Sequence, residues 1–225
     1  MKLFILILCS ISAFKTHCFE LMAYEAKYDI NRGGKKTGEQ ITRLTQLAPN
    51  LWRIEDQITG TNGMASFIGF SRSETTDFST SKNRYFATKH RMQQKAAFSK
   101  KNYQFIWKDD KKLYEIDDNN KKVVLSPVNK NIVSAQLMSL ILADAACSQK
   151  SEMDLTVLKN KQPKDYLFKI NTKDSLNAER VYDRQSKKST QIWFDKNRLC
   201  LPIKQIHKEN DEPTIETSLI DFKWL

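Results

Sequence analysis

Apolar and polar residues alternate along most of this chain, and that spacing limits the folds open to it more than any other feature of the sequence. In residues 24–31 the apolar side chains stand at every second position, with charged or amide side chains between them. Successive side chains of a β-strand point to opposite faces of a sheet, so this pattern is typical of a strand with one face in the core. The same alternation returns in residues 166–170, 199–203 and 215–219. These segments predict a mainly β protein.

Short polar segments separate the alternating ones and predict the turns. Residues 31–38 (NRGGKKTG) and 48–50 (APN) are rich in turn residues, and the Asp- and Lys-rich residues 109–112 and 117–122 are interpreted as solvated hairpin tips. Residues 64–71 (MASFIGFS) are expected to continue the series of strands. About ten strands in succession exceed what a flat open sheet tolerates, so we expect a strongly curved antiparallel sheet or an incomplete barrel.

Residues 131–147 (NIVSAQLMSLILADAAC) break the alternation. The segment contains neither Gly nor Pro, and it is apolar on nearly all sides. A helix that is apolar all round is buried, so this segment predicts one helix packed on or in the sheet. Asn129 or Asn131 is expected to cap its start. The predicted fold is therefore mainly β, of the α+β kind, with about ten strands and one apolar helix.

The start of the chain predicts export. An apolar run, LFILILCSISAF, occupies residues 3–14 and ends before Lys15. It is shorter than the roughly 20 apolar residues of a membrane span, so it predicts a secretory signal peptide over residues 1–18. A cut within the apolar run, an uncleaved anchor and a lipoprotein are the alternatives. Residues 19–225 are then expected to form one β-rich periplasmic domain with no transmembrane span after cleavage.

Cysteine usage and charge agree with export. Removal of the leader takes away Cys9 and Cys18, which leaves Cys147 and Cys200. Two thiols in an oxidising compartment can pair, so a disulfide between them is one prediction, and two separate buried thiols are the other. The formal net charge of the full chain is +11, and the positive residues are spread along it. This distribution favours solubility and a loose attraction to anionic surfaces.

We find no sequence motif that points to catalysis. GGKKTG at residues 33–38 fails as a phosphate-binding loop, because Lys36 occupies the Ser/Thr position and a strand pattern follows. His90 and His207 are too far from each other and from the two cysteines in sequence to form a recognisable ligand motif, although a composite site with both cysteines stays open. Nucleophile and nucleic-acid motifs are also missing. We therefore expect no enzymatic activity, cofactor, metal or nucleic-acid partner.

Several segments together resemble one bacterial family, the domain of unknown function 3108. They are AYEAKYDINRGGKKTGE from Ala23, SETTDF from Ser73, SAQLMSLILA from Ser134, IWFDKNRLCLPIKQ from Ile192 and the closing IDFKWL. Their order covers nearly the whole mature chain, although residues 129–131 (NKN) stand where the family usually has Asp-Pro. The resemblance implies an exported protein with a curved antiparallel sheet, similar to the open barrels of periplasmic lipoprotein carriers. It implies no established activity.

Two functions follow from these observations. The leading hypothesis is a non-enzymatic periplasmic protein whose concave sheet binds an apolar ligand, a lipid or an envelope partner through aromatic side chains. Those side chains are Tyr28, Trp52, Phe105, Trp107, Phe168 and Trp193. The other interpretation of the same residues is that they simply form the core. The alternative function is a structural or interaction module of the cell envelope that binds a protein partner or an anionic surface.

Overall fold

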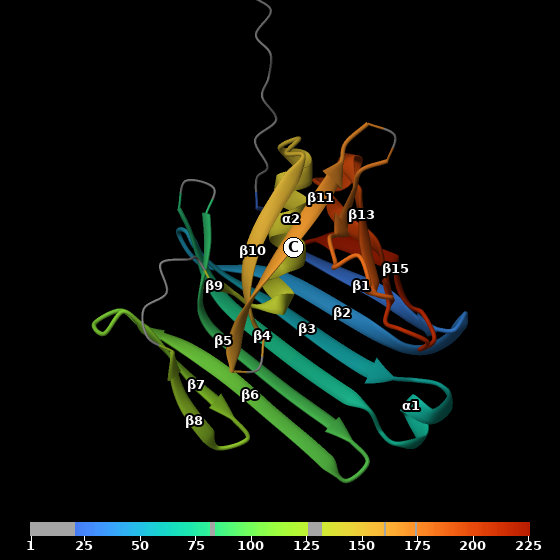
Figure 1. The fold of residues 1–225 in the computed structure, drawn as a ribbon, viewed down its shortest axis with the longest axis horizontal. Helices are drawn as coiled ribbons and strands as arrows, with labels where there is room; N and C mark the ends of the chain where they lie inside the picture. Colours follow the sequence, from blue (N-terminus) through green and yellow to red (C-terminus); the bar gives the residue numbers. More distant parts are fainter. Residues whose placement is uncertain (1–20, 82–83, 126–131, 160, 174) are drawn as a thin grey trace, which may run out of the picture.

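The computed structural model describes residues 21–225, except residues 82–83, 126–131, 160 and 174. The predicted signal peptide, its two cysteines and both predicted helix caps therefore lie outside the described residues. The described part of the chain is built on one continuous sheet (Figure 1).

Fifteen strands of the described residues make up this sheet. The first eight are β1 (Tyr24–Arg32), β2 (Lys35–Ala48), β3 (Leu51–Gly60), β4 (Ser71–Ser81), β5 (Arg84–Ala96), β6 (Ser99–Lys108), β7 (Leu113–Asp118) and β8 (Lys121–Leu125). The other seven are β9 (Ile132–Val133), β10 (Glu152–Lys159), β11 (Gln162–Asn171), β12 (Asn177–Arg180), β13 (Ser189–Asp195), β14 (Leu201–Lys208) and β15 (Ile215–Trp224).

The strands form two series that meet in the middle of the sheet. Their spatial order is β8-β7-β6-β5-β4-β3-β2-β1-β15-β14-β13-β12-β11-β10-β9. The first strand thus pairs with the last, with Tyr24 of β1 opposite Trp224 of β15. Neighbouring strands are antiparallel except for β9, which runs parallel to β10 and pairs Ile132 with Thr156.

The expectation of an antiparallel sheet or incomplete barrel of about ten strands with one helix was wrong, although the protein is mainly β. Strands β8, β9 and β12 have five, two and four residues, which is too short for an alternating pattern to stand out in the sequence. They form because an adjacent strand offers backbone groups that need hydrogen-bond partners. The parallel pair of β9 and β10 makes the sheet mixed, and sequence alternation carries no information about strand direction.

Helix α2 (Ala135–Cys147) begins four residues later than the sequence predicted. Ile132 and Val133 form β9 instead, because β-branched side chains favour a strand and β10 offers a partner edge. Ser134 caps the helix: its hydroxyl accepts a hydrogen bond from Leu137 N at 3.0 Å. Nine of the helix residues are buried, as expected for an apolar segment.

The expectation of a strand over residues 64–71 was also wrong. A short helix, α1 (Gly63–Phe67), occupies the first half of this segment, and a 3-10 helix, η1 (Lys196–Arg198), lies between β13 and β14. Glycine makes the turn into α1 possible, because a Cβ on Gly60 would lie 2.6 Å from the Ala65 carbonyl oxygen. Gly63 also has a φ of 59°, in the left-handed region that glycine adopts readily.

The sheet curls around α2 (Figure 1). The helix contacts β3 and β4 in one half of the sheet and strands β10 to β14 in the other. Edge strand β9 also packs against β5, so one end of the sheet returns to the middle of the opposite half. Strands β6, β7 and β8 extend beyond this contact. The arrangement gives a helix-filled concave face and a convex outer face.

The core lies between α2 and the concave face of the sheet. Phe78 of β4, Phe105 of β6 and Phe168 of β11 are all fully buried in the hydrophobic core. A disulfide joins Cys147, the last residue of α2, to Cys200, which directly precedes β14, and their Cα atoms are 5.8 Å apart. The end of α2 is thereby tied to the second series of strands. None of the helices in the described residues has the length and apolarity that crossing a membrane requires.

Candidate interaction surfaces

Four of the six aromatic residues that the sequence singled out lie in the core. Phe105 and Phe168 are fully buried, and Tyr28 and Trp52 are nearly so. The Tyr28 hydroxyl donates a hydrogen bond to the Pro202 carbonyl at 3.0 Å, so its polar end has a partner within the protein. These contacts support the interpretation of the four residues as core. A role in ligand binding stays a prediction.

The other two aromatic residues lie apart. Trp107 is half-buried at the end of β6, where its ring centroid is 5.2 Å from that of Phe86. Trp193 is half-buried between Ile192 and Phe194, which are both buried. Because side chains alternate along a strand, Trp193 lies on the opposite face of β13 from these neighbours. The six aromatic side chains therefore do not share one surface.

A small cavity of about 60 Å³ lies on the concave side between α2 and the meeting point of the two strand series. Its lining includes the side chains of Tyr24, Tyr28, Thr42, Asp56 and Ser139. Pockets for small organic ligands usually measure about 300–1,000 Å³, whereas one water takes about 30 Å³. This cavity suits water molecules rather than an acyl chain.

A buried polar cluster fastens the start of α2 to the sheet. The Thr76 hydroxyl on β4 donates to Gln136 Oε1 at 2.8 Å, and it lies 2.9 Å from His90 Nδ1 and 2.8 Å from Ser134 Oγ. Gln136 Nε2 donates to the Glu74 backbone carbonyl at 3.4 Å. Burial lowers the pKa of His90 to about 4, so its ring is neutral at pH 7. The polar groups of this cluster satisfy one another, which suits anchoring of the helix.

Asp56 interrupts the apolar face of β3 beside this cluster. Its Oδ1 accepts hydrogen bonds from Thr42 Oγ1 at 2.5 Å and from Gln40 Nε2 at 3.2 Å. Desolvation raises the pKa of Asp56 to about 6, and the negative charge of Glu74 adds to the shift against the Thr42 hydrogen bond. Glu74 faces Asp56 across β3 and β4 and forms an ion pair with Arg72. Both carboxylates thus have partners that hold them in place.

The two histidines do not share a site. His207 lies on β14, with its Nδ1 2.8 Å from the Thr190 hydroxyl, whereas His90 lies on β5 in the other half of the sheet. The composite site with two cysteines is closed to metal because Cys147 and Cys200 are bonded to each other. In the described part of the chain, no group of three or more His, Cys, Asp or Glu side chains is arranged to hold a metal ion.

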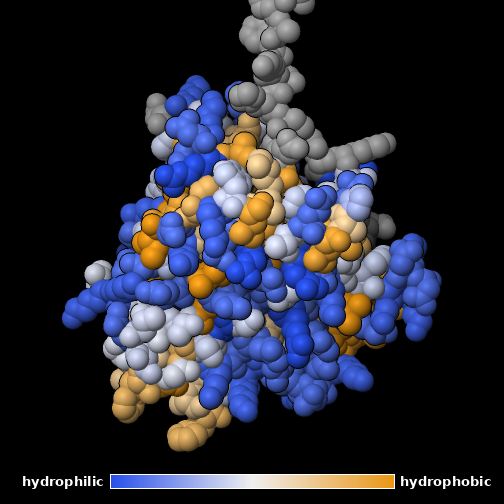
Figure 2. Space-filling view, turned by 180° about the vertical axis from the view of Figure 1, so that it is seen from behind, coloured by the Kyte–Doolittle hydropathy of each residue, from blue (hydrophilic) through white to orange (hydrophobic). Residues whose placement is uncertain are grey.

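Three exposed apolar side chains gather at one end of the molecule, and we term them the apolar tip: Met64, Phe67 and Phe98. Their exposed fractions are 71%, 87% and 106%, the highest of the large apolar side chains among the described residues. Met64 and Phe67 lie on α1, and Phe98 lies in the turn between β5 and β6. A hydrogen bond from Ala97 N to the Ile68 carbonyl, 2.6 Å long, joins the two loops. Figure 2 shows apolar side chains gathered at this end, at the lower left of the view.

Positive charge surrounds the apolar tip. Residues 57–73 and 78–108 contain no Asp or Glu. Lys95 and Lys100 are both exposed, on either side of Phe98 in the β5–β6 hairpin. Neither lysine forms an ion pair with a residue that the structure describes. The end of the molecule therefore combines exposed apolar surface with cations that have no partner in the described chain.

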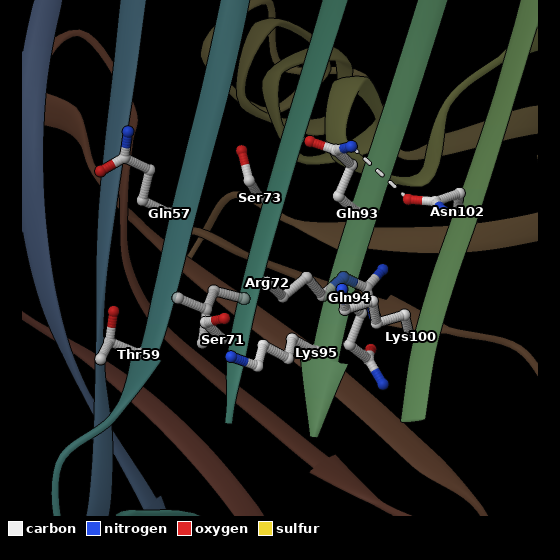
Figure 3. Close-up of a pocket in the computed structure, with 11 residues that line it drawn as sticks. Gln57, Thr59, Ser71, Arg72, Ser73, Gln93, Gln94, Lys95, Lys100 and Asn102 are labelled. Atoms are coloured by element: carbon white, nitrogen blue, oxygen red, sulfur yellow. Dashed lines mark hydrogen bonds between the residues drawn. The ribbon is translucent and has the colours of Figure 1, made fainter. Parts of the chain in front are cut away.

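An open groove of about 390 Å³ runs along the outer face of β3, β4, β5 and β6, next to the apolar tip (Figure 3). We term it the outer groove and define it by the polar side chains Gln57, Thr59, Ser71, Ser73, Gln93, Lys95, Lys100 and Asn102. The side chains stand in two rows across the strands. These rows are Gln57-Ser73-Gln93-Asn102 and Thr59-Ser71-Lys95-Lys100.

Small side chains in one strand explain the hollow. Ser71 and Ser73 of β4 are flanked by longer side chains on β3 and β5, so the floor of the groove is lower than its walls. On one wall Gln93 Nε2 donates to Asn102 Oδ1 at 3.5 Å, as Figure 3 shows. Glu74, which directly follows Ser73 on β4, is buried on the opposite face. Alternate residues of β4 therefore line the core and the outer groove.

The fold is of the barrel-like β-sheet class. A similar solved structure is a β-barrel-like protein of the domain of unknown function 1849 from Brucella abortus, with a TM-score of 0.59. The match covers 92% of this chain and 99% of that one at 9% sequence identity, so it shows the fold alone. No protein-family model and no curated protein matches this sequence. Membership of the domain of unknown function 3108 accordingly stays a prediction.

Sequence reasoning missed both the apolar tip and the outer groove. Phe98 stands alone among Ala, Ser and Lys in KAAFSKK, a setting in which a core residue would be out of place. The carboxylate-free stretches 57–73 and 78–108 were a second available signal. The groove had no comparable signal, because its rows draw one residue from each of four strands.

Proposed function

We propose that this protein is a non-enzymatic interaction module of the bacterial envelope that docks from the periplasm onto an anionic lipid surface through its apolar tip. The observation that supports this proposal is the position of Met64, Phe67 and Phe98. They are the most exposed large apolar side chains of the described residues, and they lie together on two adjoining loops. Large apolar side chains that are clustered and exposed mark sites of partner or membrane contact.

The chemistry around the tip favours a lipid surface as the partner. Aromatic and other apolar side chains insert into the boundary between headgroups and acyl chains, while cations beside them face anionic headgroups. Burial of a large apolar side chain contributes about 1.5–3 kcal/mol, and a lysine near an anionic membrane contributes about 1 kcal/mol. Phe67 and Phe98 together with Lys95 and Lys100 would therefore support a reversible association.

The scaffold behind the tip also suits this role. α1 is closed by the hydrogen bond from Ile68 N to the Met64 carbonyl at 3.0 Å, and the β5–β6 hairpin is joined to it through Ala97. Side chains displayed on hydrogen-bonded elements lose less conformational freedom on binding than side chains on loose segments do.

A ligand on the concave face is less well supported. The cavity there measures about 60 Å³, and four of the aromatic residues proposed to line it are buried against protein atoms. An apolar ligand would have to displace α2, which the buried polar cluster and the disulfide hold to the sheet. The geometry therefore favours the interaction module over the carrier.

Vesicle flotation tests the proposal. The protein used is the chain from residue 19, which contains every strand and helix of the described fold. We expect it to float with vesicles that contain phosphatidylglycerol and to remain in solution with vesicles of pure phosphatidylcholine. The double substitution Phe67→Ser with Phe98→Ser should weaken binding at least about tenfold, equivalent to about 1.4 kcal/mol.

The matched control is Val124→Ser. Val124 is 59% exposed on edge strand β8, away from the tip, so its replacement removes an exposed apolar side chain without touching the proposed surface. Its vesicle binding should equal that of the unmodified chain. Equal binding by the tip variant and the unmodified chain would overturn the proposal, and so would equal binding to both vesicle types.

A further inference from the structure

We infer that the outer groove binds a phosphate ester that carries hydroxyl groups, of the kind found in glycerol phosphate headgroups. This inference rests on the proposed function, because it names the chemical group that the membrane would present beside the apolar tip. The groove is distinct from the tip: the side chains that define it are polar and lie on the outer face of four strands, whereas the tip consists of apolar side chains on two loops.

The donors of the groove match such a ligand. Three side-chain amides, from Gln57, Gln93 and Asn102, can donate to or accept from hydroxyl groups, and the Ser71 and Ser73 hydroxyls lie on the floor between them. The ammonium groups of Lys95 and Lys100 belong to the other row and supply charge for a phosphate. Hydroxyl-binding and phosphate-binding groups thus stand side by side.

The charged side chains in the outer groove favour binding of an anion. None of the residues that line it carries a carboxylate. Glu39 faces Thr59 across β2 and β3, but its carboxylate is 2.8 Å from Lys36 Nζ and so already has a partner. Lys95 and Lys100 have no such partner in the described chain. A ligand phosphate would therefore meet two uncompensated cations without a competing carboxylate in the groove.

The distance between the groove and the tip fits the depth of a membrane interface. Phe98 follows Lys95 by three residues, and Ala96 pairs with Ser99 at the end of the hairpin. At about 3.4 Å per residue, the lysine row lies within about 10 Å of the turn that holds Phe98. Apolar groups of peripheral proteins enter the boundary between headgroups and acyl chains by about 5–10 Å. Insertion of Phe98 would therefore bring the groove level with the headgroups.

Titration followed by NMR tests the inference on soluble ligands. The chain from residue 19 is titrated separately with sn-glycerol 1-phosphate, inorganic phosphate and glycerol, and the side-chain amide signals of Gln57, Gln93 and Asn102 are followed. We expect saturable shifts with glycerol phosphate, at least severalfold weaker binding of inorganic phosphate, and no saturable shift with glycerol. The absence of a saturable response to glycerol phosphate would overturn the inference, and equal affinity for inorganic phosphate would overturn its hydroxyl part.

Two kinds of variant distinguish binding in the outer groove from nonspecific attraction to positive charge. Lys95→Gln with Lys100→Gln should weaken glycerol phosphate binding at least about tenfold, whereas Lys121→Gln with Lys122→Gln, which removes the same charge from β8, should leave it unchanged. Ser73→Gln fills the floor without changing charge and should also abolish binding. Equal effects of the two lysine pairs, or normal binding by the Ser73 variant, would contradict a built site.

The tip variant distinguishes this inference from the proposed function. Phe67→Ser with Phe98→Ser should retain glycerol phosphate binding in solution even as it loses vesicle binding. If the tip variant keeps vesicle binding, the proposed docking through the apolar tip is wrong. The titration with soluble glycerol phosphate then still tests the outer groove separately. Competition decides the source of the ligand: soluble glycerol phosphate should displace the chain from phosphatidylglycerol vesicles if the groove takes a lipid headgroup. Failure to displace it would overturn the headgroup assignment in favour of a free phosphate ester.

Discussion

The concave and outer faces of strands β3 to β6 share one backbone but differ in almost every physical property. Ile54, Thr76 and Phe105 are buried on the concave face, whereas Gln57 and Ser73 are exposed in the outer groove. The two-residue period of a strand allows this separation, because each face receives every second side chain. One face can therefore hold the fold together while the other is free to bind. Substitutions on the first should change stability, and substitutions on the second should change binding.

The largest expected effect is on the concave face. Phe105→Ala should lower the free energy of unfolding by about 3–5 kcal/mol, because loss of a fully buried ring would leave a cavity beside the rings of His90 and Tyr114. Gln104, the preceding residue, lies on the outer face, and Gln104→Ala should change the free energy of unfolding by less than about 0.5 kcal/mol. Urea unfolding followed by circular dichroism measures both values. Equal losses would show that the two faces are not energetically distinct.

The buried polar cluster should give the next largest effect. Thr76→Val removes the hydroxyl that Gln136, His90 and Ser134 share, and we expect a loss of about 2–3 kcal/mol from the polar groups left without a partner. Thr75→Val makes the same chemical change on the outer face and should stay within about 0.5 kcal/mol. The same unfolding assay applies. A loss of less than about 1 kcal/mol for Thr76→Val would mean that the cluster does not anchor α2.

Asp56 should make the free energy of unfolding fall as pH rises from about 4 to about 6, which is opposite to the usual effect of a carboxylate. Its pKa rises from 3.8 in the unfolded chain to about 6 in the fold, so the folded state binds the proton more tightly. The penalty for ionising it is absent below about pH 4, grows as pH rises to about 6, and is complete above that, with a size of about 3 kcal/mol. Asp56→Asn should flatten this decline in unfolding free energy between pH 4 and 6. An unchanged decline in the variant would show that another group causes it.

Salt should produce the smallest effect and act on the outer face alone. A rise in ionic strength from about 0.1 M to about 1 M shortens the Debye length from about 10 Å to about 3 Å, which screens the exposed lysines beside the tip. Vesicle binding should weaken severalfold, while the free energy of unfolding should change by less than about 1 kcal/mol. Flotation and urea unfolding at both salt concentrations check this. Vesicle binding that is independent of salt would show that the apolar tip binds without a contribution from Lys95 and Lys100.

The sequence predicted the local elements better than their assembly. Alternation located β1, β2 and β3 and the hairpin tips at residues 109–112 and 117–122, all of which the structure contains. The start of α2 was misplaced, because Ile132 and Val133 continue an apolar run that suits a helix or a strand equally well. Contact with β10 decided between the two.

The candidate surfaces were the least predictable part. The aromatic residues selected from the sequence proved to be scattered, since alternation does not say which of two faces will be covered by a helix. Trp193 shows the difficulty: it is half-buried on the face opposite its buried neighbours Ile192 and Phe194, whereas Phe105 is fully buried.

What the sequence determined by itself is therefore local: a mainly β chain, one buried helix and a pair of cysteines beyond the predicted leader. Each of these depends on the chemical type and spacing of residues close to one another in the chain. The tertiary structure decided the strand order, the pairing of β1 with β15 and the meeting of α1 with the β5–β6 turn. The apolar tip and the outer groove arise only from that arrangement, because their residues come from separate segments that only the curvature and register of the sheet bring together.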